Sequence, residues 1–188
     1  MADFKIAYEK TAIIEGGYAN HPDDSGGETW RGIARNYHPK WLGWTIVDSL
    51  KPITRNFEAN LRASNTLQRL VLEFYKEEFW DVMLLDQVNN QDIANEMYDT
   101  GVNMDPKYPI EFLQLALNST NRNGRDYPDV IVDGRMGAKT VSALNLHPRP
   151  RQILTLLNCQ QGVRYMNIAR NNPTQEKFMT SWLSRVVI

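Results

Sequence analysis

Most of what this sequence predicts rests on one segment, Glu15-Gly16-Gly17-Tyr18, followed after five residues by Asp24-Ser25-Gly26-Gly27-Glu28-Thr29-Trp30-Arg31-Gly32-Ile33. The first acid, Glu15, stands at the end of an apolar helical stretch, and the second, Asp24, opens a run rich in glycine. An acid at a helix break, with a second acid and a hydroxyl close by, is the residue set that acid-assisted hydrolysis of a sugar polymer needs.

The residues before the glycines predict a helix from Phe4 to Glu15, with Asp3 as its N-cap. Glu15 falls on the same face as Phe4 and Thr11, so it extends a mostly apolar stripe. Gly16 and Gly17 end the helix, because glycine readily adopts the backbone conformation of a helix C-terminus. Residues 19–32 hold clusters of proline, aspartate and glycine and predict a loop or one small β-hairpin.

Each acid suits one role in glycoside hydrolysis. Burial beside an apolar helix face favours the protonated form of Glu15, which could then protonate the leaving oxygen. Asp24, in a polar glycine-rich loop, would stay ionised, and Thr29 could hold the attacking water. The alternatives are structural: Glu15 as an ion-paired helix end and Asp24 as a turn residue. A metal site on His21, Asp23 and Asp24 is a further alternative, but no second histidine lies nearby in the sequence.

The rest of the chain predicts a mainly α protein. Helical periodicity is clear from Ser64 to Trp80, where Leu67, Val71 and Phe74 share a face. The segment Trp41–Trp44, between prolines at 39 and 52, has no clear period and gives no prediction. Further helices are expected at residues 92–100 (ending at Gly101), 109–117 (opened by Pro109), 137–145, 150–170 and 174–185.

Composition excludes several classes of protein. The 188 residues carry a net charge of −1, so no basic field points to nucleic acid. Cys159 is the single cysteine, which excludes an internal disulfide, and its leucine neighbours predict a buried side chain. The N-terminus has no apolar signal core and no later run could insert into a membrane. We therefore expect synthesis in the cytoplasm without a signal peptide, and action on an outer substrate only after release by a holin-like or other route.

The order Glu-Gly-Gly-Tyr, then Asp-x-Gly-Gly-x-Thr-x-x-Gly-Ile, resembles the N-terminal signature of glycoside hydrolase family 108, the N-acetylmuramidases. The similarity continues through Phe79-Trp80-Asp81 and Tyr98-Asp99-Thr100-Gly101-Val102-Asn103. Later motifs resemble the predicted peptidoglycan-binding region of such proteins: Leu113-Gln114-x-Ala116-Leu117, Val132-Asp133-Gly134-x-x-Gly137-x-x-Thr140 and Phe178-x-x-x-Trp182-x-x-Arg185. The resemblance covers nearly the whole chain.

The resemblance implies a lysozyme-like helical fold and a muramidase that cleaves β-1,4 bonds between N-acetylmuramic acid and N-acetylglucosamine, without cofactor or metal. It implies that Glu15 is the catalytic acid. The similar Glu, Asp, Thr arrangement of phage lysozymes implies that Asp24 and Thr29 position the water. Two departures from the pattern bear on the second role: four rather than five residues separate Asp24 from Thr29, and Glu28 adds an unexpected acid.

Candidate substrate contacts lie in two places. Tyr18 and Trp30 could stack on sugar rings, although core packing is the alternative for both. Asp99 and Asn103, four residues apart, could line a groove or satisfy backbone groups near Gly101. We expect residues 1–100 to form the catalytic region and 101–188 a helical peptidoglycan-binding region, with glycan strands as the partner of a monomer. The rival functions are a lytic transglycosylase and a non-catalytic wall-binding or secretion-accessory protein.

Overall fold

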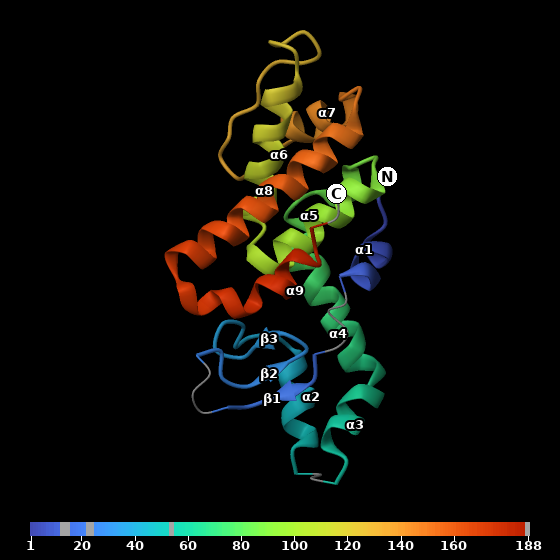
Figure 1. Ribbon diagram of the computed structural model, residues 1–188. Coiled ribbons are helices and arrows are strands. Elements are labelled where there is room, and N and C mark those ends of the chain that lie inside the picture. The colour runs from blue at the N-terminus through green and yellow to red at the C-terminus, as the bar shows by residue number, and fades with distance from the viewer. Residues whose placement is uncertain (12–15, 22–24, 53–54, 187–188) are drawn as a thin grey trace. The chain divides into compact units, whose positions relative to one another are not determined.

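The computed structural model describes residues 1–11, 16–21, 25–52 and 55–186. Within these ranges the protein is mainly helical with one small antiparallel sheet, which confirms the predicted class (Figure 1). The sheet consists of β1 (Tyr18–Ala19), β2 (Thr29–Trp30) and β3 (Ile33–Ala34). The helices are α1 (Phe4–Lys10), α2 (Gly43–Leu50), α3 (Phe57–Ala63), α4 (Asn65–Tyr75), α5 (Gln91–Met104), α6 (Lys107–Thr120), α7 (Ala138–Leu146), α8 (Pro150–Asn171) and α9 (Met179–Leu183).

The chain forms two compact units. One consists of residues 12–78 and contains the sheet with α2, α3 and α4. The other joins residues 1–11 to residues 79–188 and contains the remaining helices. Each unit is described by itself below.

The sheet of the first unit has the order β1-β2-β3, with Tyr18 opposite Trp30 and Thr29 opposite Ala34. Arg31 and Gly32 form the two-residue turn between β2 and β3, and their φ angles are 47° and 81°. Two positive φ angles in a two-residue hairpin are the mark of a type I′ turn, whose twist matches that of the strands. The expected hairpin is therefore present, and a third strand extends it.

Helices α2, α3 and α4 pack against one another in the same unit (Figure 1). The Ser64 hydroxyl accepts a hydrogen bond from the Leu67 backbone N–H and so caps α4. Leu67, Val71 and Phe74 are buried along one face of α4. After Tyr75 the helix continues as a π-helical segment, Lys76–Asp81.

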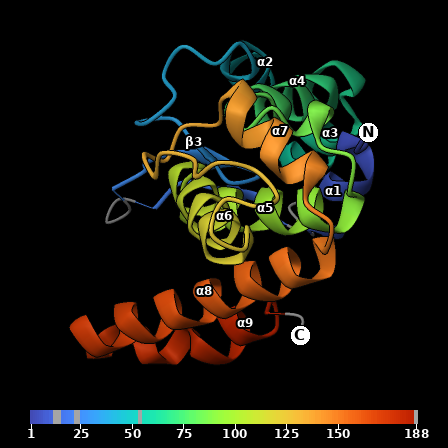
Figure 2. The ribbon, with the colours of Figure 1, turned by 90° about the horizontal axis from the view of Figure 1, so that it is seen from above.

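In the second unit α5 packs against α1, α6 and α8. Phe4 of α1 contacts the rings of Tyr8, Trp80 and Tyr98 at centroid distances of 5.6, 5.7 and 5.7 Å. The apolar stripe of the N-terminal helix is therefore buried in an aromatic cluster. Figure 2 shows α9 running beside α8, and the Tyr165 and Trp182 rings of these two segments stack at 5.1 Å.

Three local predictions differ from the structure. Helix α1 ends at Lys10 rather than at Glu15, and the Thr11 hydroxyl bonds to the Ala7 carbonyl at that end. Gly101 does not end α5, which continues to Met104. The absence of a side chain at Gly101 instead leaves room for Met83, whose Cε would lie 2.8 Å from an added Cβ. Helix α6 begins at Lys107, two residues before Pro109.

Cys159 also departs from its prediction, because its side chain is exposed rather than buried. The long helices from residues 138 to 171 agree with the sequence pattern. No helix in the described ranges is long and apolar enough to cross a membrane.

Candidate active site

The two acids that the sequence singles out, Glu15 and Asp24, lie outside the described residues. The residues on their C-terminal sides, Gly16 and Ser25, are described and show how the flanking chain is held. A Cβ added to Gly16 would come within 3.2 Å of the Arg31 Cα, and the Gly17 carbonyl accepts a hydrogen bond from the Arg31 N–H. The Glu-Gly-Gly motif therefore needs glycine because its backbone lies directly against the β2–β3 turn.

The glycine-rich run after Asp24 is held by the segment that follows β3. Asn36 donates from its side chain to the Ser25 carbonyl, at 3.0 Å, and from its backbone to the Gly26 carbonyl. The Ser25 and Tyr37 hydroxyls lie 3.0 Å apart. Gly27 has a φ of 66°, and a Cβ there would meet the Asn36 amide at 2.8 Å. Both the backbone conformation and the packing thus require the second glycine of the pair.

Thr29 lies on the middle strand and is half-buried, and its hydroxyl donates to the Gly27 carbonyl at 3.2 Å. Successive side chains of a strand point to opposite faces. Glu28 and Trp30, on either side of Thr29, are both buried. Thr29 therefore occupies the face opposite to these two side chains, where its oxygen retains the capacity to bind water.

Trp30 is fully buried, so the expected stacking on a sugar ring is not what this structure shows. The guanidinium groups of Arg31 and Arg62 lie 5.7 and 5.9 Å from its ring centroid. The indole Nε1 has no hydrogen-bond partner among the described residues. The position of Trp30 in the glycine-rich segment suggested a ligand contact, but the alternation of the strand turns the ring into the core.

Glu28 is the centre of an ion-pair network that the sequence did not predict. Its carboxylate accepts hydrogen bonds from the Tyr18 hydroxyl at 2.8 Å and from Arg35, and lies 2.9 Å from the Lys51 ammonium. Arg35 and Lys51 also bind Asp48 on α2. Burial alone would raise the pKa of Glu28, but the hydrogen bonds from Lys51, Arg35 and Tyr18 outweigh it and lower the pKa. Glu28 is therefore an ionised, fully partnered carboxylate of the scaffold.

Tyr18 serves the same network. Its hydroxyl donates to Glu28, and its ring meets the edge of Phe57 at a centroid distance of 4.9 Å. Burial and the neighbouring Glu28 carboxylate raise the pKa of Tyr18. The tyrosine is half-buried, and it directly follows Gly17 in the chain.

Replacing Glu28 by Gln should lower the free energy of unfolding at pH 7 by about 1–2 kcal/mol, because charge-assisted bonds to Arg35 and Lys51 are lost. The lowered pKa means that this stabilisation exists above the unfolded-state pKa and disappears as the pH falls through the folded-state value. Urea denaturation at pH 7 and at pH 3.5 should therefore show a smaller difference between variant and wild type at the lower pH. Glu58→Gln, which breaks an exposed pair with Arg62, is the control and should cost less. Equal effects of the two substitutions at pH 7 would contradict the network's role.

Asp99 and Asn103 belong to the second compact unit. The Asp99 carboxylate accepts a hydrogen bond from Arg185 at 2.7 Å, and the exposed Asn103 amide donates to the Asp99 backbone carbonyl. Burial raises the pKa of Asp99, although Arg185 acts in the opposite direction. The Asn103 amide therefore satisfies a backbone carbonyl in this structure, and a role of the two residues in lining a groove stays a prediction.

Sequence reasoning missed the buried acid one turn before Asp99. Glu96 is 9% exposed, and its carboxylate accepts a hydrogen bond from Thr100, which in turn accepts one from Gln161 of α8. Burial, with the Asp99 charge added to it, raises the pKa of Glu96 to about 7. The spacing of Glu96 and Asp99 in the sequence could have pointed to a raised pKa, because acids at i and i+3 share a helix face and repel each other.

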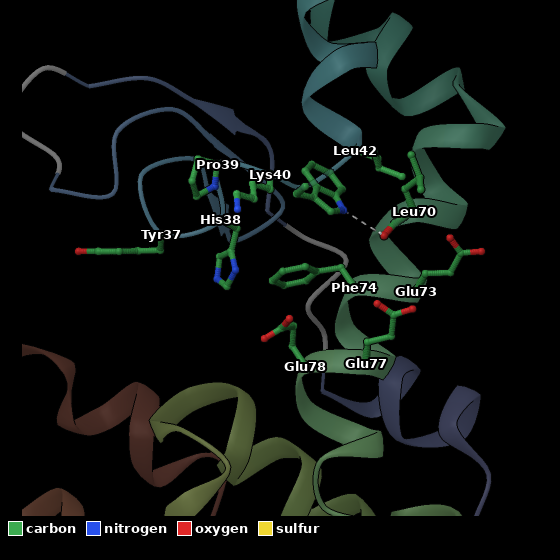
Figure 3. Close-up of a pocket in the computed structure, with 11 residues that line it drawn as sticks. Tyr37, His38, Pro39, Lys40, Leu42, Leu70, Glu73, Phe74, Glu77 and Glu78 are labelled. Carbon is green, nitrogen blue, oxygen red and sulfur yellow. Dashed lines mark hydrogen bonds between the residues drawn. The ribbon is translucent and has the colours of Figure 1, made fainter.

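A pocket of about 600 Å³ opens in the first unit between residues 37–42 and α4 (Figure 3). His38 and Phe74 meet inside it edge to face, at a centroid distance of 4.7 Å, and Trp41 donates a hydrogen bond to the Leu70 carbonyl. Residues 25–28, through Ser25 and Tyr37, touch the same loop. No group of three or more His, Cys, Asp or Glu suited to a metal ion occurs among the residues that the structure describes.

Comparisons with known proteins give matches to both the first and the second half of the chain. Residues 8–104 match the family model described as glycosyl hydrolase 108, and residues 108–187 match the model described as a predicted peptidoglycan domain. The solved structure of SagA from Brucella abortus has the same fold, with a TM-score of 0.60, 22% sequence identity, and coverage of 97% of this chain and 88% of that chain. A comparison with curated protein sequences gave no match.

These matches define the class of protein as a glycoside hydrolase that acts on peptidoglycan. Because the first model covers just over half of the chain, the protein belongs to glycosyl hydrolase family 108.

Proposed function

We propose that the protein is an N-acetylmuramidase that hydrolyses the β-1,4 bond from N-acetylmuramic acid to N-acetylglucosamine, with Glu15 as the general acid. Asp24 and Thr29 hold the attacking water on the opposite face of the sugar ring. The observation that carries the proposal is the packing of Gly16 and Gly17 against the β2–β3 turn. This packing ties the chain next to Glu15 to the hairpin that bears Thr29.

Glu28 is the additional acid that departs from the family pattern, and its contacts support the roles proposed for Glu15 and Asp24. A free acid beside Thr29 would compete with Asp24 for the water or share a proton with Glu15. Glu28 is instead held by Tyr18, Arg35 and Lys51, and its lowered pKa makes it a poor proton donor. Glu28 therefore does not compete for the roles proposed for Glu15 and Asp24.

We further propose that residues 1–100 carry the reaction and that residues 101–188 bind the wall polymer as part of the same monomeric protein. The match of residues 108–187 to a peptidoglycan domain supports the second role. The predicted sites Glu15, Asp24 and Thr29 all lie within the hydrolase match, residues 8–104.

The products of the reaction distinguish hydrolysis from lytic transglycosylation. If a water is activated, mass spectrometry of murein digested by the wild-type protein should show muramic acid ends that carry that water. Transglycosylation uses no external water, so the product closes on itself and is one water lighter. Anhydro ends as the main product would overturn the roles given to Asp24 and Thr29. Intact murein would overturn the enzymatic function and favour a wall-binding protein.

A further inference from the structure

The pocket between residues 37–42 and α4 lies beside the predicted catalytic segment. Tyr37, at one end of the loop, contacts Ser25, the residue after Asp24. On the other wall, Tyr75 of α4 donates a hydrogen bond of 2.8 Å to the Arg31 carbonyl, in the turn that follows Thr29. Both walls of the pocket are therefore fastened to the hairpin of the proposed active site.

The interior of the pocket is aromatic and fixed in place. Phe74 is 8% exposed and packs edge-on against His38 and Trp41. Trp41 is held by its hydrogen bond to the Leu70 carbonyl, and by an edge contact with Trp44 at 5.2 Å. Such a preformed apolar surface can receive an aliphatic chain without ordering its own side chains first.

The charge of the pocket is negative. Glu73, Glu77 and Glu78 line the α4 side, and Lys40 is the one lysine or arginine among the described lining residues. Glu73 is already paired with Arg69. Glu77 and Glu78 are exposed and form no ion pair with any residue in the described ranges. The pocket therefore repels anions and has carboxylates available for a cation.

Glu78 is the carboxylate best placed to meet a ligand inside the pocket. Figure 3 shows Phe74 of α4 and Glu78 of the π-helical segment that follows it pointing toward His38, whereas Glu73 and Glu77 point to another side. Glu78 stands in the π-helical segment Lys76–Asp81, and such segments are rare and frequent at functional sites. An aromatic ring with a carboxylate one turn away suits a protonated amine on a short aliphatic chain.

We propose that this pocket binds the side-chain ammonium group of a diamino acid in the peptide arm of peptidoglycan, with Glu78 as the ion-pair partner and Phe74 with His38 as the apolar wall. The inference rests on the proposed function, because peptidoglycan is the substrate that brings this group to the active site. A cross-link converts the ammonium group of the acceptor peptide into an amide, whereas uncross-linked peptides and donor peptides keep theirs. The pocket would thus favour glycan strands whose peptides have not served as acceptors in a cross-link.

The first test uses kinetics on two forms of the same substrate. Wild-type protein should show a KM roughly 5-fold higher on murein whose amino groups have been acetylated than on untreated murein. The kcat should stay the same, because the contact is remote from the bond that breaks. Glu78→Gln should raise the KM on untreated murein by a similar factor and have no effect on acetylated murein. Glu9→Gln, an exposed carboxylate on α1, is the matched control and should change neither.

The second test measures ligand binding to the pocket without any hydrolysis of murein. Titration with N-acetyl-lysine methylamide should shift the Trp41 indole N–H signal in NMR spectra of the wild-type protein, and the neutral norleucine analogue should not. Glu78→Gln should abolish the shift. Equal response to both compounds, or an equal KM on both forms of murein, would overturn the proposal. Wild type that binds the lysine compound but clears no murein would refute the hydrolase function and leave the ammonium site standing.

Discussion

Glu15→Gln should reduce the rate at which the protein clears a murein suspension by about 10²- to 10⁴-fold, the usual contribution of a general acid. Glutamine has nearly the shape of glutamic acid but cannot donate a proton to the leaving oxygen. The loss should appear in kcat, since the interaction matters in the transition state rather than in substrate binding. Turbidity decay with purified wild type and variant measures it directly.

The control for this experiment is Glu9→Gln, which removes an exposed carboxylate from α1, six residues before Glu15 in the sequence. Its clearing rate should equal that of the wild type. Circular dichroism of all three proteins checks that they are folded. If Glu15→Gln clears murein as fast as the wild type, then Glu15 is not the acid and the mechanism proposed above is wrong.

The second large effect concerns stability and pH. Glu96 is buried in α5, with its pKa raised from 4.5 to about 7 by burial and by Asp99. Its protonated form is compatible with burial, so the folded state binds this proton more tightly than the unfolded chain. The associated stability is complete below the unfolded-state pKa of 4.5 and is lost as the pH rises through about 7. The change amounts to about 3 kcal/mol.

Glu96→Gln should remove this pH dependence. Glutamine keeps an oxygen that can accept the Thr100 hydrogen bond and has no charge to bury. Urea denaturation followed by circular dichroism should show equal stability of variant and wild type at pH 4.5. At pH 8 the variant should be more stable by about 3 kcal/mol. The groups that surround Glu96 in the same unit are Asp99, Thr100, Asn158, Gln161 and Arg185.

Glu176→Gln provides the matched control, because Glu176 is an exposed acid of the same compact unit. This variant should follow the wild-type curve between pH 4.5 and 8. The acid-side loss of the Glu28 network occurs below this window, since the pKa of that carboxyl is lowered rather than raised. A wild-type pH slope that persists unchanged in Glu96→Gln would show that Glu96 is not the titrating group.

The glycines of the opening segment show what could be predicted without a structure. The sequence indicated a loop or hairpin over residues 19–32, and this expectation follows from backbone sterics that act locally. The two positive φ angles at Arg31 and Gly32 and the Ser64 cap of α4 are local features of the same kind that the structure adds. The spacing of apolar residues likewise predicted the long helices, because buried side chains recur every three or four residues along a helix.

Helices α2 and α3 show where local signals fail. The segment of α2 offers tryptophans between prolines with no clean period, and the segment of α3 gave no prediction. Both helices pack on α4. The predicted helix end at Gly101 was wrong for the same reason. The small residue accommodates the Met83 side chain within a continuous helix. These outcomes depend on partners that are distant in the chain, which no local pattern contains.

By itself, the sequence determined the helical class, the hairpin, the family and the identity of Glu15, Asp24 and Thr29 as candidate catalysts. Only the tertiary structure decided which other polar and aromatic groups are available for chemistry. It buried Trp30, paired Glu28 with Arg35 and Lys51, and placed Glu78 beside an aromatic pocket with no ion pair to another described residue. The physical reason is that the chemistry of a side chain depends on solvation and on neighbouring charges, both of which the fold sets.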